Sequence, residues 1–168
     1  AIMPLVSLQA RKLGVRVQLQ CEPALAAVHC DRTMVEQVLL NLARNAMQAM
    51  EGVPLTERVL ELHASTPARL SANVDANSSA RWIEFTVADQ GAGIDAATAQ
   101  RLFTPFFTTK QEGMGLGLSL CRTVVEQHGG SLAFDSRKPR GTVFKFTLPV
   151  APLLPLALPV PSPLTLPT

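Results

Sequence analysis

One long amphipathic segment, from Asp31 to Met50, constrains the fold more than any other part of the sequence. Its apolar residues recur at the spacing of one helix face, three or four positions apart: Val35, Val38, Leu39, Leu42, Ala46 and Ala49. Asp31 is a suitable N-cap, and Gly52 and Pro54 end the pattern. Because such a helix has to bury its apolar stripe, the chain must supply a second layer that covers it.

Segments with the period of β-strands surround this helix. Residues 15–20, VRVQLQ, alternate at a period of two. By their composition and flanking turn residues, further strands are expected at residues 26–30, 58–65, 81–89, 131–136 and 142–149, and further helices at residues 95–102 and 116–128. Since the elements mix without regular βαβ alternation, the simplest architecture is an α/β two-layer sandwich, with helices on one face of a mixed sheet.

The composition indicates one folded domain and a tail. The chain has 168 residues, 47% of them hydrophobic, which suffices for a single core. Residues 151–168 carry no charge and a proline every few positions, which favours a disordered end, with a docking peptide as the alternative. We predict the end of a preceding linker or helix at residues 1–12, the domain at residues 13–150 and the tail at residues 151–168.

Charge and hydropathy argue against several functional classes. The net charge is +2 and no basic run is interleaved with aromatics, so a nucleic-acid partner is not expected. The three histidines, His29, His63 and His128, have no acidic partners at metal-ligand spacing. The sequence has no uninterrupted apolar stretch of about 18 residues. We expect a cytoplasmic location, whether or not a parent protein is anchored in the inner membrane.

Three polar residues follow one another along the long helix. Gln37, Asn41 and Asn45 are spaced by four and therefore stack on one face, beside the apolar stripe. Asparagine is a mediocre residue for a helix interior, and a neutral amide oxygen is a suitable ligand for Mg²⁺. The two asparagines predict a metal or polar ligand, unless they bond to neighbouring backbone or face water.

A strand followed by glycines supplies a second candidate site. Asp89 ends the strand predicted at residues 81–89, and Gly91 and Gly93 follow it. A carboxylate there can accept a hydrogen bond from an exocyclic amine such as that of adenine, and the glycines leave room for a flat base. A tight turn with Asp95 as a helix cap would explain the same pattern.

The segment RLFTPFFTTKQEGMGLGL, residues 101–118, has the composition of a lid over phosphates. Gly113, Gly115 and Gly117 let the backbone approach a ligand, and the helix start that follows offers N–H groups to an anion. Lys110 adds a mobile positive charge. Glycines also mark ordinary turns, so the segment alone does not decide the function.

Taken in order, these motifs resemble the ATP-binding domain of sensor histidine kinases, in the superfamily that includes gyrases, Hsp90-type chaperones and MutL-type proteins. The motifs that carry the resemblance are Asn41 and Asn45, DxGxG at residues 89–93, FTPFF at residues 103–107, GMGLGL at residues 113–118, and Gly141 with Thr142. Alone, this last pair could be a plain hairpin turn. The resemblance covers residues 13–149 and is strongest to the nitrogen-regulatory, dicarboxylate-sensing and oxygen-sensing branch. It implies a Bergerat-type fold, about three helices over a largely antiparallel sheet.

The resemblance also implies roles for particular residues. Asn45 would bind Mg²⁺, Asn41 would contact metal or phosphates, and Lys110 would reach the phosphates, which makes these three the catalytic candidates. Asp89 would bind the adenine amine with Thr142 behind it. The other cofactor contacts would be Gly91, Gly93, Phe103, Gly113, Gly115, Leu116 and Gly117. Phe103, Phe106 and Phe107 resemble a hinge, and a role in the core is equally compatible with them.

The implied function is to bind Mg-ATP and donate its γ-phosphoryl group to a histidine. That histidine would lie on a separate dimerisation domain of a homodimeric parent, which then serves a response regulator, whereas the fragment itself should be monomeric. None of the three histidines of this sequence fits the acceptor motif. Gln48 stands where many relatives have a basic residue, so nucleotide affinity should be modest.

The position of Asn41 also bears on the reaction. Related ATPases have a catalytic glutamate at this position, four residues before the Mg²⁺-binding asparagine, so Asn41 favours phosphotransfer over activation of water. The alternatives are a related ATPase, a serine kinase of the anti-sigma type, and an ATP-binding module without catalysis.

Overall fold

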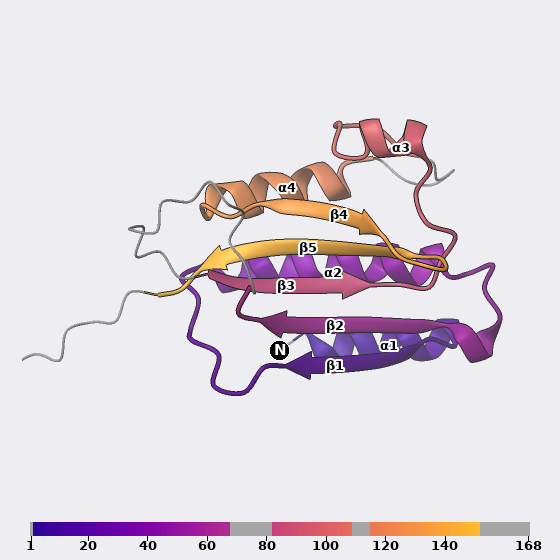
Figure 1. Ribbon diagram of the computed structural model, residues 1–168, viewed down its shortest axis with the longest axis horizontal. Helices are drawn as coiled ribbons and strands as arrows, with labels where there is room; N and C mark the ends of the chain where they lie inside the picture. The colour runs from indigo at the N-terminus through magenta and orange to yellow at the C-terminus, as the bar shows by residue number, and fades with distance from the viewer. Residues whose placement is uncertain (1, 68–81, 109–114, 152–168) are drawn as a thin grey trace, which may run out of the picture.

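The computed structural model describes residues 2–67, 82–108 and 115–151. Five strands form one mixed sheet in the order β1-β2-β3-β5-β4 (Figure 1). The strands are β1 (Arg16–Cys21), β2 (Val59–Ser65), β3 (Trp82–Ala88), β4 (Leu132–Ser136) and β5 (Thr142–Pro149). The β1–β2 pair is parallel, and the other three pairs are antiparallel.

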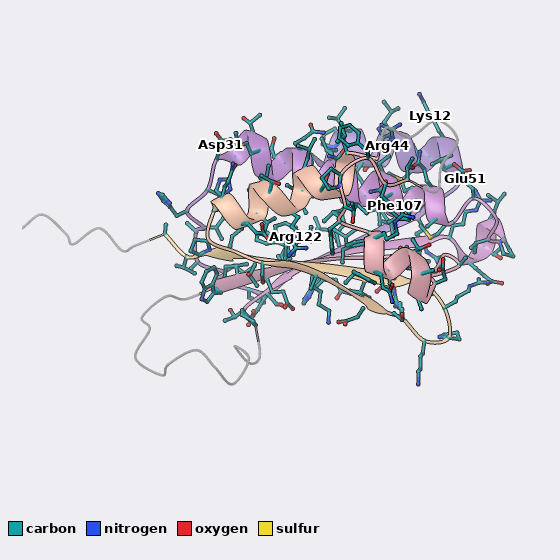
Figure 2. All side chains as sticks on the ribbon, turned by 90° about the horizontal axis from the view of Figure 1, so that it is seen from above. Lys12, Asp31, Arg44, Glu51, Phe107 and Arg122 are labelled. Atoms are coloured by element: carbon teal, nitrogen blue, oxygen red, sulfur yellow. The ribbon has the colours of Figure 1, made fainter. Side chains whose placement is uncertain are left out.

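The helices form the second layer. They are α1 (Met3–Leu13), α2 (Arg32–Ala49), the short α3 (Ala96–Arg101) and α4 (Gly117–Gln127), and a 3-10 turn, η1, covers Leu55–Glu57. Seen from above, α1, α2 and α4 lie on one side of the sheet (Figure 2), and no helix of the described residues covers the other side. None of the described helices combines the length and hydropathy that crossing a bilayer requires.

The core lies between these two layers. Leu42 and Met47 of α2 are fully buried, as are Leu60 of β2 and Phe146 of β5. Successive side chains of a strand point to opposite faces of the sheet, and in β5 every second residue is therefore buried. Val6 of α1 belongs to the same core.

The expected fold is confirmed, a two-layer α/β sandwich with a largely antiparallel sheet. Asp31 caps α2 by accepting a hydrogen bond from Met34 N at 3.0 Å. Asp95 likewise caps α3, so the helix cap that was the alternative explanation of the DxGxG pattern at residues 89–93 is present.

The strand predicted at residues 26–30 is wrong. This segment makes only an isolated bridge, Val28 to Val150. The segment lies beside the end of β5, and its pairing consists of two backbone hydrogen bonds, from His29 N to the Pro149 carbonyl at 2.9 Å and from Ala151 N to the Ala27 carbonyl at 2.7 Å. Because β5 ends at Pro149, this pairing does not extend into a ladder. The division into residues 1–12, 13–150 and 151–168 stays a prediction, and residues 152–168 lie outside the described part.

Candidate functional site

Asp89 is the polar centre of the predicted site. It is 2% exposed and follows β3 directly. Its Oδ1 accepts hydrogen bonds from Gly91 N at 2.8 Å and from Thr142 N at 3.2 Å, while its own N–H donates to the Thr142 carbonyl at 2.9 Å. Both hydrogen bonds that the described residues make to the carboxylate end on Oδ1, so Oδ2 can serve a ligand.

Burial raises the pKa of Asp89 above its ordinary value, because desolvation disfavours the charged form. Three smaller effects oppose it: the bonds from Gly91 and Thr142, and the positive charge of Arg137. The site therefore contains a buried carboxylate that its neighbours hold toward the ionised state.

Close backbone packing fixes the loop around Asp89. Gly141 precedes Thr142 with a φ of 109°, and a Cβ there would collide with the carbonyl group of Asp89. A Cβ at Gly91 would lie 2.6 Å from the Ala49 carbonyl oxygen of α2. The β4–β5 hairpin and the end of α2 thus hold residues 89–91 between them.

The two asparagines of α2 lie along the helix at increasing distance from the contact between Ala49 and this loop. Asn45 is one turn before Ala49, and Asn41 is one turn earlier, so all three share a face. Both asparagines are half-buried. Asn41 lies near the thiol of Cys121 in α4: burial raises the pKa of this thiol to about 11, against the lowering effect of Asn41, and the thiol itself donates to the Val38 carbonyl at 3.9 Å. The amide face therefore runs from the Asp89 loop to α4.

The start of α4 lies beside the phenylalanine segment. A Cβ at Gly115, where φ is 69°, would come within 2.5 Å of the Phe106 carbonyl carbon. Leu116 occupies the N-cap of α4 without a side-chain cap bond, and the first turn, from Gly117, contains no acidic residue. The first N–H groups of such a helix have no intrahelical partners and attract anions. Lys110 and Gly113 lie outside the described residues.

The three phenylalanines have different environments. Phe103 packs against the core, 6.0 Å from the ring of Phe134. Phe107 stacks under the guanidinium of Arg101, which is 4.5 Å from its centroid, and Figure 2 shows it at the α3 side of the helix layer. Phe106 is 76% exposed and has a φ of 63°. Phe103 therefore has a packing role, whatever contact it makes with a cofactor.

The structure brings four of the predicted site residues together around one loop. Asp89, Gly91, Gly93 and Thr142 form one loop cluster, since a Cβ at Gly93 would contact the Gly141 carbonyl oxygen at 3.5 Å. The sequence does not show the contacts of Arg137 with Glu61 and of Cys121 with Val38, because these partners are far away in the chain. No local motif marks either one.

Comparison with known proteins identifies the class. The profile of the histidine kinase-, DNA gyrase B- and HSP90-like ATPases matches residues 30–152. The chain belongs to this family.

Individual relatives narrow the class to sensor kinases. The chain is 43% identical over 141 residues to the C4-dicarboxylate transport sensor protein DctS of Rhodobacter capsulatus, covering 84% of this chain and 20% of DctS. It is 38% identical over 142 residues to the sensor protein FixL of Bradyrhizobium diazoefficiens, covering 84% and 26%. NtrB of Rhizobium leguminosarum, a sensory histidine kinase/phosphatase, is 36% identical over 138 residues, covering 82% and 36%. The predicted family and branch are confirmed.

Solved structures agree with this assignment. The nucleotide-free catalytic domain of the histidine kinase ThkA superposes with a TM-score of 0.69 at 28% identity, covering 90% of both chains. Full-length ShkA in complex with AMPPNP gives a TM-score of 0.70 at 25% identity, covering 92% of this chain and 30% of ShkA. The chain corresponds to the catalytic ATPase domain of sensor histidine kinases and spans about a quarter of the length of relatives such as FixL.

Proposed function

We propose that this chain binds Mg-ATP and donates the γ-phosphoryl group to a histidine on a separate dimerisation domain. The observation that carries the proposal is the fixed carboxylate of Asp89, beside a helix face that leads through Asn45 and Asn41 to α4. The family assignment and the AMPPNP complex of ShkA support it.

The base end of the nucleotide would bind at the Asp89 loop. Because Oδ1 is held by two backbone N–H groups, Oδ2 would accept a hydrogen bond from the exocyclic amine of adenine. Gly91 and Gly93 would line the base without side chains in the way. Thr142, 3% exposed, would hold the carboxylate from behind.

The phosphate end would bind between α2 and the start of α4. Gly115, Leu116 and Gly117 would present backbone N–H groups, and Lys110 and Gly113, which are not described structurally, would complete this end. The half-buried amides of Asn45 and Asn41 suit Mg²⁺, a hard cation that binds oxygen ligands of the protein and phosphate oxygens of the substrate at the same time. When bound, Mg²⁺ would neutralise the negative charge of the phosphates.

The chemistry that follows is positioning of the donor. The γ-phosphorus would form a bond to an imidazole nitrogen while its bond to the bridging oxygen of ADP breaks, with Asn41, Asn45 and Lys110 placed around the phosphates. Because Asn41 offers an amide and no carboxylate, it cannot act as the base that activates water. The acceptor histidine, a homodimeric parent and a response regulator belong to the rest of the proposed kinase.

Calorimetry with Mg-AMPPNP tests the binding step. The 168-residue chain should bind it with micromolar or weaker affinity, and less well after chelation of Mg²⁺. Asn45→Ala should weaken binding and remove most of the Mg²⁺ dependence, whereas Gln37→Ala, an exposed amide on the same helix, should leave both unchanged. Equal binding by wild type, Asn45→Ala and Asp89→Asn would refute the assigned site.

A transfer assay tests the second step. With γ-labelled ATP, acid-labile label should appear on an added helical domain that carries the acceptor histidine, and not on the chain alone. Rapid release of phosphate by the isolated chain would favour a water-activating ATPase. Binding of Mg-ATP with neither transfer nor phosphate release would favour an ATP-binding module without catalysis, and absence of any binding heat would indicate a vestigial nucleotide site in a module that serves only docking.

A further inference from the structure

The side chain of Arg58 binds three backbone carbonyls at the place where two helices end. Arg58 directly precedes β2 and is half-buried. Its Nη1 donates to the Leu13 carbonyl at 2.7 Å, its Nη2 to the Glu51 carbonyl at 2.6 Å, and its Nε to the Val53 carbonyl at 2.7 Å. Leu13 is the last residue of α1, and the other two lie in the turn that follows α2. One guanidinium therefore joins the ends of both helices to the start of β2.

The end of α2 needs such a cation. The last carbonyls of a helix have no intrahelical partners, and the helix dipole concentrates negative charge there. The last turn of α2 contains no basic residue. Among the described residues, no salt bridge includes Arg58, so its guanidinium is committed to these carbonyls.

The turn after α2 is anchored at two positions and exposed between them. Met50 and Val53 are buried in the core. Glu51 and Gly52 are exposed, and a Cβ on Gly52 would meet no atom within 4 Å. Glycine also leaves the backbone free to adopt other conformations. The hydrogen bond from Arg58 to the Glu51 carbonyl therefore fixes the part of the turn that the core does not.

The base loop rests on the residue just before this turn. A Cβ on Gly91 would lie 2.6 Å from the carbonyl oxygen of Ala49 and 2.9 Å from its Cβ. Ala49 is the last residue of α2 and stands two positions before Glu51. Gly91 N in turn donates to Asp89 Oδ1 at 2.8 Å. A continuous series of contacts thus leads from Arg58 through the end of α2 to the Asp89 carboxylate.

Other cations at this end of the molecule do not bind the turn. Figure 2 shows Lys12, in the last turn of α1, at the same end of the helix layer as Glu51. Lys12 is exposed. Arg140 of the β4–β5 hairpin forms a salt bridge with Glu57 of η1. Lys12 therefore offers a control for the loss of a positive charge without the loss of carbonyl bonds.

We propose that Arg58 is a positioning residue for the base site, where it holds the end of α2 against Gly91 and so fixes the place of the Asp89 carboxylate. This role rests on the proposed function, in which Asp89 accepts a hydrogen bond from the adenine amine. The bond to the Leu13 carbonyl holds the guanidinium in place from the side of α1. The planar fork of arginine suits several carbonyls at fixed positions, whereas the ammonium of lysine is a single point charge.

Amide hydrogen exchange in the ligand-free 168-residue chain tests the contact without nucleotide. Arg58→Met keeps an apolar side chain but removes the three bonds, and should make the Gly91 amide exchange at least about threefold faster. The Met34 amide, which donates to Asp31 Oδ1 at the other end of α2, should keep its rate. A general loss of stability would raise both rates. Lys12→Met should change neither.

Discrimination between bases gives the second readout. In Arg58→Met, affinity for Mg-ATP should fall roughly threefold to tenfold, the size expected when a charge-assisted hydrogen bond is weakened but not lost. Affinity for Mg-inosine triphosphate should fall less, because its oxygen makes no such bond with Asp89. The phosphates are the same in both ligands, so the ratio of the two affinities reports the base end alone. Partial unfolding would lower both affinities equally and leave the ratio unchanged.

The two readouts have to change together. Wild-type exchange of Gly91 in Arg58→Met, or a wild-type ratio of affinities, would overturn the positioning role. If Arg58→Met does not fold, Arg58→Lys decides: intermediate values support the role of the guanidinium fork, and wild-type values overturn it. A wild-type chain that binds no nucleotide would instead defeat the proposed function, and with it the role of Arg58 in base binding, whatever the exchange of Gly91 shows.

Discussion

Replacing Asp89 by asparagine should invert the hydrogen bonding that the base site offers. The side-chain oxygen must stay where Oδ1 is, because Gly91 N and Thr142 N donate to it at 2.8 and 3.2 Å. The new NH₂ group is therefore forced into the position of Oδ2. A flipped amide would place a donor against two donors, at a cost of about 1–3 kcal/mol for each group left unsatisfied.

The loss of ATP affinity follows from this geometry. Wild type would make a hydrogen bond between a charged acceptor and the adenine amine, worth about 1.5–3 kcal/mol, and the variant would leave that amine facing another donor, at a further cost of about 1–3 kcal/mol. The lower part of the summed range, about 3 kcal/mol, already corresponds to a loss of roughly a hundredfold in affinity.

The same inversion should favour a different base. Inosine triphosphate carries an oxygen where adenine carries the amine, so the NH₂ group of the variant could donate to it. Calorimetric titration of both proteins with the Mg²⁺ complexes of ATP and inosine triphosphate should show the preference for ATP reduced or reversed in Asp89→Asn. Near-ultraviolet circular dichroism should confirm an intact fold. A variant that binds ATP within about threefold of wild type would refute the reasoning.

The stability of this variant provides an independent check. Burial raises the folded-state pKa of Asp89 above its unfolded value, so the carboxyl contributes stability only below the unfolded pKa, and this contribution is lost as pH rises through the folded one. At neutral pH the ionised group costs stability, and Asp89→Asn should be at least as stable as wild type. Urea unfolding should show this advantage at pH 7 and its decline toward pH 3, whereas a variant less stable at pH 7 would contradict the sign.

Three further substitutions and one exposed control substitution test the packing. Gly141→Ala should destabilise the domain by about 1–3 kcal/mol, since its Cβ would strike the Asp89 carbonyl at a positive φ; thermal unfolding measures this. His128→Ala removes the ring that accepts from Asp31 N at 2.9 Å and contacts the Val124 carbonyl at 2.7 Å, and should cost about 1–3 kcal/mol in urea unfolding. Leu42→Ala at 0% exposure should cost about 2–5 kcal/mol by the same assay, against less than about 0.5 kcal/mol for Leu120→Ala at 55% exposure.

Much of the fold could be predicted because its signals are local. The apolar period of α2 and its cap at Asp31 depend on residues a few positions apart, as do the alternation in β5 and the cap at Asp95. The segment at residues 26–30 has the composition of a strand, but its single bridge depends on where Val150 lies. Pairing partners are not encoded in the composition of a short segment.

The same distinction between local signals and long-range pairing applies to the residues of the candidate site. Asp89 and the glycines could be selected as candidates from their spacing, and the hairpin turn suspected at Gly141 and Thr142 is the element that delivers a backbone N–H to Asp89. Nothing in the local sequence distinguishes a hairpin that supports a site from one that only turns the chain. The difference arises because β3 and β5 are neighbours in the sheet although Asp89 and Thr142 are 53 positions apart in the sequence.

Arg137 makes a contact that the local sequence does not predict. As one residue of a polar turn it resembles a solvent-exposed cation, which would contribute little to stability. Its ion pair with Glu61 depends on the strand order, which places β3 and β5 between β4 and β2, so that the guanidinium spans both strands to reach Glu61.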